Sequence, residues 1–143
     1  MPVDAIGIGR SALDVEWQRL QIIAQNLANQ NTSRIAGGGT YRPLRVISGP
    51  AGDFSRMITA GQPVATPQGV RVISIEADGG NVRRIYDPGH PDAGADGFVA
   101  YPGVDLASEM TLLSKTARVY ESNLTLISLA QQMNMRALEL GKR

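Results

Sequence analysis

The chain has 143 residues, a net charge of +1 and no cysteine. This length suits one domain, and a content of 43% hydrophobic but only 5% aromatic residues predicts a mainly aliphatic core. The 14 basic and 13 acidic residues are spread along the chain, which argues against nucleic-acid binding, and the lack of cysteine excludes disulfides, thiolate catalysis and cysteine-based metal sites.

The first residues do not have the pattern of a Sec-type signal peptide. Residues 1–17 lack a basic segment followed by a continuous apolar segment. No apolar run elsewhere approaches the length of a membrane span. Export, if it occurs, is therefore expected to use another route.

Residues 5–30 have the periodicity of an amphipathic helix. Polar residues such as Asp14, Gln18 and Gln21 separate the apolar ones. The spacing of four and three positions is that of a heptad seam, which predicts packing against another helix. The seam residues are Leu13, Trp17, Leu20, Ala24 and Leu27.

Three asparagines gather where this helix should end, in the stretch AQNLANQNTSR. Asn31 takes the heptad position after Leu27, and a polar residue at a seam position can fix register and partner choice. Asn26 and Asn29 can hydrogen-bond across a helix interface or to the last carbonyls of the helix. The alternative is an ordinary helix end followed by a loop.

The middle of the chain, residues 35–103, is rich in glycine and proline. Residues 41–48 predict a short strand. Residues 69–77 and 81–87 are also rich in β-branched and aromatic residues. Because Asp78, Gly79 and Gly80 separate these two runs, we expect them to pair as a hairpin.

Two further stretches of the middle region have no strand pattern. Residues 49–68 have no clean period and predict a mobile loop. Residues 87–103 consist of turn-forming residues throughout, with Pro88, Gly89 and Pro91 expected to fix a tight turn.

Residues 104–140 predict a second and longer helix. Asp105 favours its start and Gly141 its end. After residue 127 the stripe shifts by one position, as expected when a straight helix carries a heptad repeat. The predicted apolar residues are Leu106, Met110, Leu113, Ala117, Tyr120, Leu124 and Ile127, followed by Leu126, Ala130, Met133, Ala137 and Leu140.

These elements predict a mainly α fold with a small β region. An N-terminal segment (1–34) and a C-terminal segment (104–143) pair as an antiparallel coiled coil, joined by a loop and β region (35–103). The longer helix has more apolar surface than the shorter one can cover, and exposed apolar stripes mark interaction surfaces. We expect neighbouring subunits to bury the surplus, whereas the alternative is a monomeric α+β domain.

No catalytic, cofactor or metal site emerges from the residues. DAGADG (92–97) departs from a calcium-binding loop because Gly94 and Gly103 replace the required carboxylates. No nucleophile elbow or P-loop is present. A metal-dependent enzyme using Asp87 and His90 is the least favoured interpretation, and we expect no enzyme activity, no cofactor and no metal.

Four stretches resemble the flagellar basal-body rod proteins. They are SALDVEWQRLQIIAQNLANQNT, GGGTYRPLRV, YDPGHPDAGADGFVAYPGVDLASEM and KTARVYESNLTLISLAQQMNMRALELGKR. The Asn-Leu-Ala-Asn motif is shared by rod, hook and hook-associated proteins. The Asp-Pro-Gly-His-Pro-Asp run followed by Tyr-Pro is similar to the proximal-rod member of this superfamily.

The resemblance implies a structural rod subunit that self-assembles into a hollow drive shaft across the periplasm. It implies export without a cleaved signal by the flagellar export apparatus. The implied partners are copies of the chain, other rod proteins and basal-body ring or junction components, with no nucleic acid and no membrane span. A soluble helical binding module, or a paralogue in another flagellar-type system, is the alternative.

Two residue sets follow. The expected assembly interface comprises Leu13, Trp17, Leu20, Asn26, Leu27, Ala28, Asn29, Asn31, Met110, Leu113, Tyr120, Leu124, Ile127 and Met133, in which the resemblance assigns residues 26–29 to the family motif. The signature turn that the resemblance implies comprises Asp87, Pro88, Gly89, His90, Pro91, Asp92, Tyr101 and Pro102.

Overall fold

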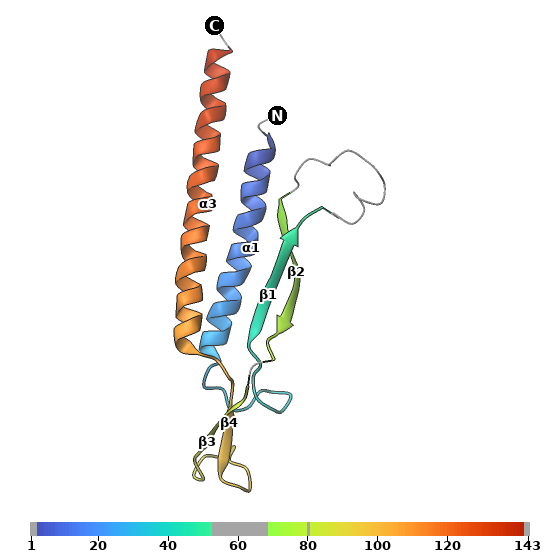
Figure 1. The fold of residues 1–143 in the computed structure, drawn as a ribbon, viewed down its shortest axis with the longest axis vertical. Helices are drawn as coiled ribbons and strands as arrows, with labels where there is room; N and C mark the ends of the chain where they lie inside the picture. Colours follow the sequence, from blue (N-terminus) through green and yellow to red (C-terminus); the bar gives the residue numbers. More distant parts are fainter. Residues whose placement is uncertain (1–2, 53–68, 80, 142–143) are drawn as a thin grey trace.

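Two long helices dominate the computed structural model, which describes residues 3–52, 69–79 and 81–141. Helices α1 (Val3–Ala28) and α3 (Leu106–Leu140) run side by side in opposite directions (Figure 1). The predicted helices over residues 5–30 and 104–140 are confirmed with boundaries shifted by about two residues. With 35 residues, α3 is roughly 52 Å long.

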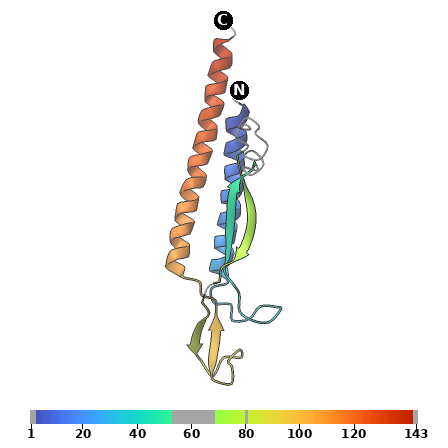
Figure 2. The same cartoon turned by 45° about the vertical axis from the view of Figure 1, so that its right-hand side comes forward.

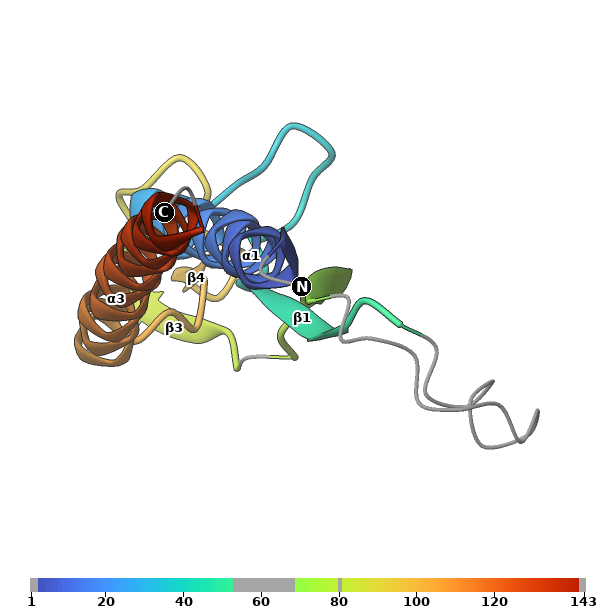
Figure 3. The same ribbon diagram turned by 90° about the horizontal axis from the view of Figure 1, so that it is seen from above.

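Helix α1 is the middle layer of the molecule, as the view along the helices shows (Figure 3). Helix α3 covers one side of it. A hairpin of β1 (Leu44–Pro50) and β2 (Val70–Ala77) covers the other side. The β1–β2 pairing is antiparallel, with a register shift between Ile47 and Ser48.

Side chains of α1 hold this hairpin in place. The Oγ of Ser11 accepts a hydrogen bond from the Val70 N–H at 3.0 Å. The guanidinium of Arg19 donates to the Val46 carbonyl at 3.4 Å and to Ser48 Oγ at 3.1 Å. The hairpin is thus fixed to the helix at the start of β2 and in the middle of β1.

A second hairpin extends beyond the ends of the helices, away from the chain termini (Figures 1 and 2). It consists of β3 (Arg83–Tyr86) and β4 (Phe98–Tyr101), paired antiparallel. The prediction that residues 69–77 pair with residues 81–87 is therefore wrong. Each run is a strand, but the alternation that predicts a strand does not identify its partner.

Local contacts explain the observed pairing. The Asp78 N–H donates to the Pro43 carbonyl at 2.7 Å, and its carboxylate forms an ion pair with Arg45 at 3.3 Å, so the end of β2 is held beside the start of β1. In the second hairpin, the rings of Tyr86 and Phe98 stack edge to face at 5.3 Å.

The interpretation of residues 87–103 as turns throughout is also wrong, because β4 lies within this segment. The turn residues connect β3 to β4, while Phe98–Tyr101 supplies the return strand. The predicted loop over residues 49–68 falls mostly outside the described residues; residues 49 and 50 belong to β1.

Helix α3 begins with a side-chain cap. The Asp105 carboxylate accepts hydrogen bonds from the N–H and the hydroxyl of Ser108. These bonds hold the pKa of the Asp105 carboxyl below its ordinary value, the hydroxyl having the larger effect and the N–H the next. Gly141 follows the last turn, and its N–H donates to the Ala137 carbonyl at 3.1 Å.

Contacts along the helix pair set its register. The rings of Trp17 and Tyr120 lie 6.3 Å apart. Gly9 faces Ile127, and Asn26 lies beside Glu109. Because the end of α3 extends past the start of α1, its last turns lie beyond the helix pair (Figure 1).

The hydrophobic core is small. Among the described residues, the buried hydrophobic side chains are Val15, Ile23, Val46 and Val99. Asn26, Glu109 and Thr116 are equally inaccessible. The interior is therefore unusually polar for its size, with Val99 at the base of the second hairpin and the others around α1.

Candidate assembly interface

Asn26 is completely buried where α1, β1 and the start of α3 meet. Its Nδ2 donates to the Leu44 carbonyl at 2.9 Å, and its Oδ1 accepts from the Leu44 N–H at 2.8 Å. Nδ2 also lies 3.5 Å from a carboxylate oxygen of Glu109, across the helix interface. The asparagine therefore satisfies both backbone groups at the start of β1 and contacts α3.

A charged network surrounds this asparagine. The buried Glu109 carboxylate forms an ion pair with Arg45 of β1 at 2.5 Å. The Tyr41 hydroxyl donates to Asn26 Oδ1 at 2.9 Å. Burial raises the pKa of the Tyr41 phenol, and the negative charge of Glu109 raises it further, while Arg45 acts in the opposite direction.

We call this group of two buried and three half-buried residues the polar cluster: Asn26, Tyr41, Leu44, Arg45 and Glu109. It joins the end of α1, the first strand and the first turn of α3 through side-chain bonds. Buried polar groups are stabilising only when satisfied. The cluster therefore fixes how the three elements meet.

The residues that follow Asn26 lie in the last turn of α1 and in the turn after it. Asn29 is half-buried, and its Nδ2 donates to the Gln25 carbonyl at 2.9 Å, so it satisfies one of the last helix carbonyls as the sequence suggested. Leu27 is half-buried, whereas Ala28 and Asn31 are exposed. Asn31 lies in the turn that follows the helix.

The face of α3 that contacts α1 is more polar than the predicted seam. Buried and half-buried positions recur every three or four residues along it. Expected apolar side chains are interspersed with polar ones at these positions. These positions are Glu109, Leu113, Thr116, Tyr120, Asn123, Ile127, Ala130 and Asn134.

The remaining apolar residues of the predicted seam lie beside this contact rather than in it. Met110 is 47% exposed, Leu124 46% and Met133 63%. Trp17 on α1 is 52% exposed, although its ring reaches Tyr120. Leu13 and Leu20 are half-buried.

The signature turn folds back against the residues that follow α1. The Ser33 hydroxyl donates to the Asp92 carboxylate at 2.7 Å, and Arg34 forms an ion pair with the same group at 3.6 Å. His90 Nδ1 accepts from the Asp92 N–H at 3.0 Å, and its ring lies edge-on to Tyr101. These contacts therefore explain how the conformation of the signature turn is held.

Exposure differs across the signature turn. Pro102 is buried, and His90, Asp92 and Tyr101 are half-buried. The exposed members are Asp87, Pro88, Gly89 and Pro91. The turn thus anchors the second hairpin on one side and presents its tip on the other.

Comparison with known proteins decides the family. Residues 95–140 match the family described as flagellar basal body rod FlgEFG protein, C-terminal. Flagellar basal-body rod protein FlgC of Bacillus subtilis is 32% identical, with 96% of this chain and 97% of the relative covered. The Borreliella burgdorferi protein of that name is 35% identical, with 95% of each chain covered, and that of Salmonella typhimurium 31%, with 94% of each.

The chain belongs to the FlgC family of flagellar basal-body rod proteins. It is therefore a structural component of the rod and not an enzyme, as the resemblance implied. The residues that match the C-terminal family model include β4 and all of α3.

Apart from Leu44, which contributes backbone groups, three members of the polar cluster in this FlgC-family chain were also not identified from the sequence: Tyr41, Arg45 and Glu109. Each looked like an ordinary polar residue of a strand or of an outer helix face. The sequence signal that could have identified Glu109 was its heptad spacing with Thr116 and Asn123, next to the apolar stripe. That spacing indicates a polar face but not which face meets α1.

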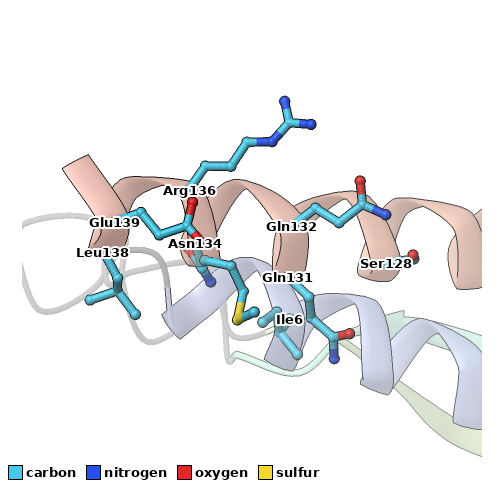
Figure 4. Close-up of a pocket in the computed structure, with 9 residues that line it drawn as sticks. Ile6, Ser128, Gln131, Gln132, Asn134, Arg136, Leu138 and Glu139 are labelled. Carbon is cyan, nitrogen blue, oxygen red and sulfur yellow. The ribbon is translucent and has the colours of Figure 1, made fainter.

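Two further features bear on the site. Among the described residues, no group of three potential metal ligands is found, and no helix is long and apolar enough to cross a membrane. A groove of about 700 Å³ lies where the start of α1 meets the second half of α3, and Figure 4 shows Ile6 of α1 facing side chains of α3 across it.

Proposed function

We propose that this chain is a subunit of the proximal rod, where copies of it and other rod proteins form a hollow shaft that transmits torque across the periplasm. Family membership supports a place in the rod. The observation that supports the mode of assembly is the apolar surface of α3, which its own α1 leaves uncovered.

The exposed side chains are large enough to drive association. Full burial of a leucine or methionine side chain is worth about 1.5–3 kcal/mol. Met110, Leu124 and Met133 are each about half exposed or more, so each has apolar surface left to bury. Several such contacts per subunit would offset the entropy lost on assembly.

We assign the parts of the chain accordingly. Residues 1–34 and 104–143 form the helical layer that contacts neighbouring subunits, and residues 35–103 form a smaller module beside it. The proposed interface residues are Leu13, Trp17, Leu20, Asn26, Leu27, Ala28, Asn29, Asn31, Met110, Leu113, Tyr120, Leu124, Ile127 and Met133. Because Asn26 is fully buried, it acts by holding α1 against β1 and α3 rather than by direct contact.

The route to the rod forms part of the same proposal. The chain passes unfolded through the flagellar export apparatus and keeps its N-terminal segment. It then folds against its neighbours and against ring or junction components of the basal body. Because the core is small and polar, the free energy needed to unfold the chain is low, which supports this route.

The test replaces one exposed interface residue. Leu124→Asp puts a charge on the apolar surface of α3 without disturbing the polar cluster. Quantitative mass spectrometry on purified hook–basal bodies should find the wild-type chain and little or none of the variant, and swimming should be lost. The matched control is Thr125→Asp, on the polar side of the same turn, where the side chain is exposed and its hydroxyl donates to the Glu121 backbone carbonyl.

Two results would contradict the proposal. Absence of the wild-type chain from the particles would exclude a rod subunit in that flagellar system. Equal incorporation of Leu124→Asp and Thr125→Asp would show that the apolar surface of α3 is not an assembly contact.

A further inference from the structure

Helix α3 has two exposed apolar flanks. The first flank comprises Leu106, Met110, Ala117, Leu124 and Met135; all are exposed except Ala117, which is half-buried. The second flank comprises Val119, Leu126, Leu129, Met133 and Leu140, all of them exposed. Four members of the second flank recur at heptad intervals, from Val119 to Leu140.

The flanks lie on roughly opposite sides of α3. Each residue of a helix is rotated by about 100° from the one before it. By this rule the face that carries Glu109, Tyr120 and Ile127 lies between the two flanks, and this is the face that contacts α1. One helix therefore presents separate apolar surfaces to its left and right neighbours.

Charge distinguishes the two flanks. Glu121 and Glu139 border the first flank on its outer side. Lys115 lies within the second flank, and Arg118 and Arg136 border it on its outer side. All five side chains are exposed, and within the described part of the chain none of them forms an ion pair. Acidic side chains thus border the first flank, and basic side chains border the second.

We infer that the first flank of one copy binds the second flank of the next copy, with the two α3 helices parallel. This inference rests on the proposed function. It makes the contact heterologous, because two different surfaces of the same chain meet. A two-fold contact would instead place acidic edge against acidic edge, or basic against basic.

The positions of the charges set the offset between copies. Glu121 and Glu139 are about five helical turns apart, and Arg118 and Arg136 have the same separation. A displacement of about 4.5 Å along the axis brings both acids beside both arginines of the neighbour. At that offset Leu124 lies between Val119 and Leu126 of the next copy, and both copies keep α1 on the same side of the α3 layer.

The groove between the start of α1 and the second half of α3 extends the first flank. It is lined by Met135 of that flank and by Ile6, Gln131 and Leu138. Figure 4 shows Ile6 of α1 beside Gln131 of α3, while Arg136 points away from α1. At the proposed offset, Met133 of the neighbour lies at this level, so its flexible side chain can fill the groove.

The absence of cysteine from the chain makes the contact testable by cross-linking. Two differently tagged copies are expressed together, one with Leu124→Cys and the other with Val119→Cys, and basal bodies are purified and oxidised. We expect the conjugates to carry both tags. Each variant expressed alone should give no dimer, because positions 124 and 119 lie on opposite flanks.

The outcomes separate this inference from the proposed function. Particles that contain both chains but no mixed conjugate overturn the inference and leave the rod assignment intact. Dimers of a single variant, or conjugates to another rod protein only, also overturn it. Loss of the wild-type chain from the particles contradicts the proposed function itself. If Leu124→Cys or Val119→Cys impairs incorporation, the exposed pair Glu139→Cys and Arg136→Cys gives the same readout without altering the apolar flanks.

Discussion

At the scale of single residues, Asn26 links more of the structure than any apolar neighbour. A buried amide is costly unless it is satisfied, and this one is bonded to Leu44 through both its oxygen and its nitrogen. Without it, the N–H and carbonyl of Leu44 would lose this partner in a partly buried environment. The Asn26 side chain thus makes the two backbone hydrogen bonds with Leu44, the first residue of β1, that a neighbouring strand would otherwise make.

Asn26→Ala should lower the free energy of unfolding by about 3 kcal/mol, because it leaves two backbone groups of Leu44 unsatisfied. Urea unfolding of the purified chain, followed by circular dichroism, measures this change. Asn29→Ala is the matched control and should cost under about 1 kcal/mol, since its bond to Gln25 is exposed. Similar losses for both variants would show that the motif acts only as a helix end.

The cap of α3 gives a pH dependence with a defined sign. The pKa of Asp105 is lowered from 3.8 mainly by the Ser108 hydroxyl, so its contribution to stability is present above pH 3.8 and is lost as pH falls through the lower, folded-state pKa. Asp105→Asn still accepts these bonds but does not titrate. Helix content should therefore fall less steeply in the variant below pH 3.8. Identical acid profiles would rule out this role.

At the scale of elements, the two long helices approach closely where α1 has no side chain. A Cβ at Gly9 would lie 2.6 Å from Ile127 Cγ1, whereas nothing lies within 4 Å of one at Gly7. Both glycines are helical, so alanine gains helix propensity at either position. Only at Gly9 does the added methyl group of alanine also force the two helices apart.

Gly7→Ala should therefore stabilise the chain by about 0.5–1 kcal/mol, and Gly9→Ala should be less stable than Gly7→Ala by about 1–3 kcal/mol. The two unfolding midpoints, measured under the same conditions, give this difference. Equal stability would mean that α1 and α3 do not pack at this level in the isolated chain.

The elements were predictable except for β4, which lies in a stretch predicted to consist of turns, and the strand partners were less predictable. Heptad spacing located both helices, and alternation located the strands over residues 41–48, 69–77 and 81–87. The same alternation suits any neighbouring strand, so it could not show that β2 pairs with β1 and β3 with β4. The hydrogen bond from Asp78 to Pro43, which holds the end of β2 beside the start of β1, joins residues far apart in the sequence.

The candidate site was predictable to a similar extent. An asparagine inside a helical pattern marked Asn26 before its partners were known. The sequence also indicated an apolar stripe on α3, yet periodicity alone could not show that Met110 and Leu124 lie outside the contact with α1. That required the rotation of α3 about its axis, which the ion pair between the buried Glu109 and the half-buried Arg45 helps to set.

At the scale of the whole molecule, stability is distributed unevenly. The polar cluster and Ile23 lie at one end of the helix pair, next to β1. At the other end, Met135, Leu138 and Leu140 of α3 are all more than half exposed. Regions with few buried contacts open at low free energy, so the isolated chain should fray from its termini.

Hydrogen exchange of the isolated chain should therefore show a gradient along α3. Amides near Glu109 and Thr116 should be the most protected, and those beyond Met133 should exchange almost as fast as in an unfolded peptide. In purified basal bodies the same C-terminal amides should become protected, because neighbouring copies cover the flanks that are exposed in the single chain. Uniform protection of α3 in the isolated chain would contradict this account, since the last turns would then be stable without any neighbour.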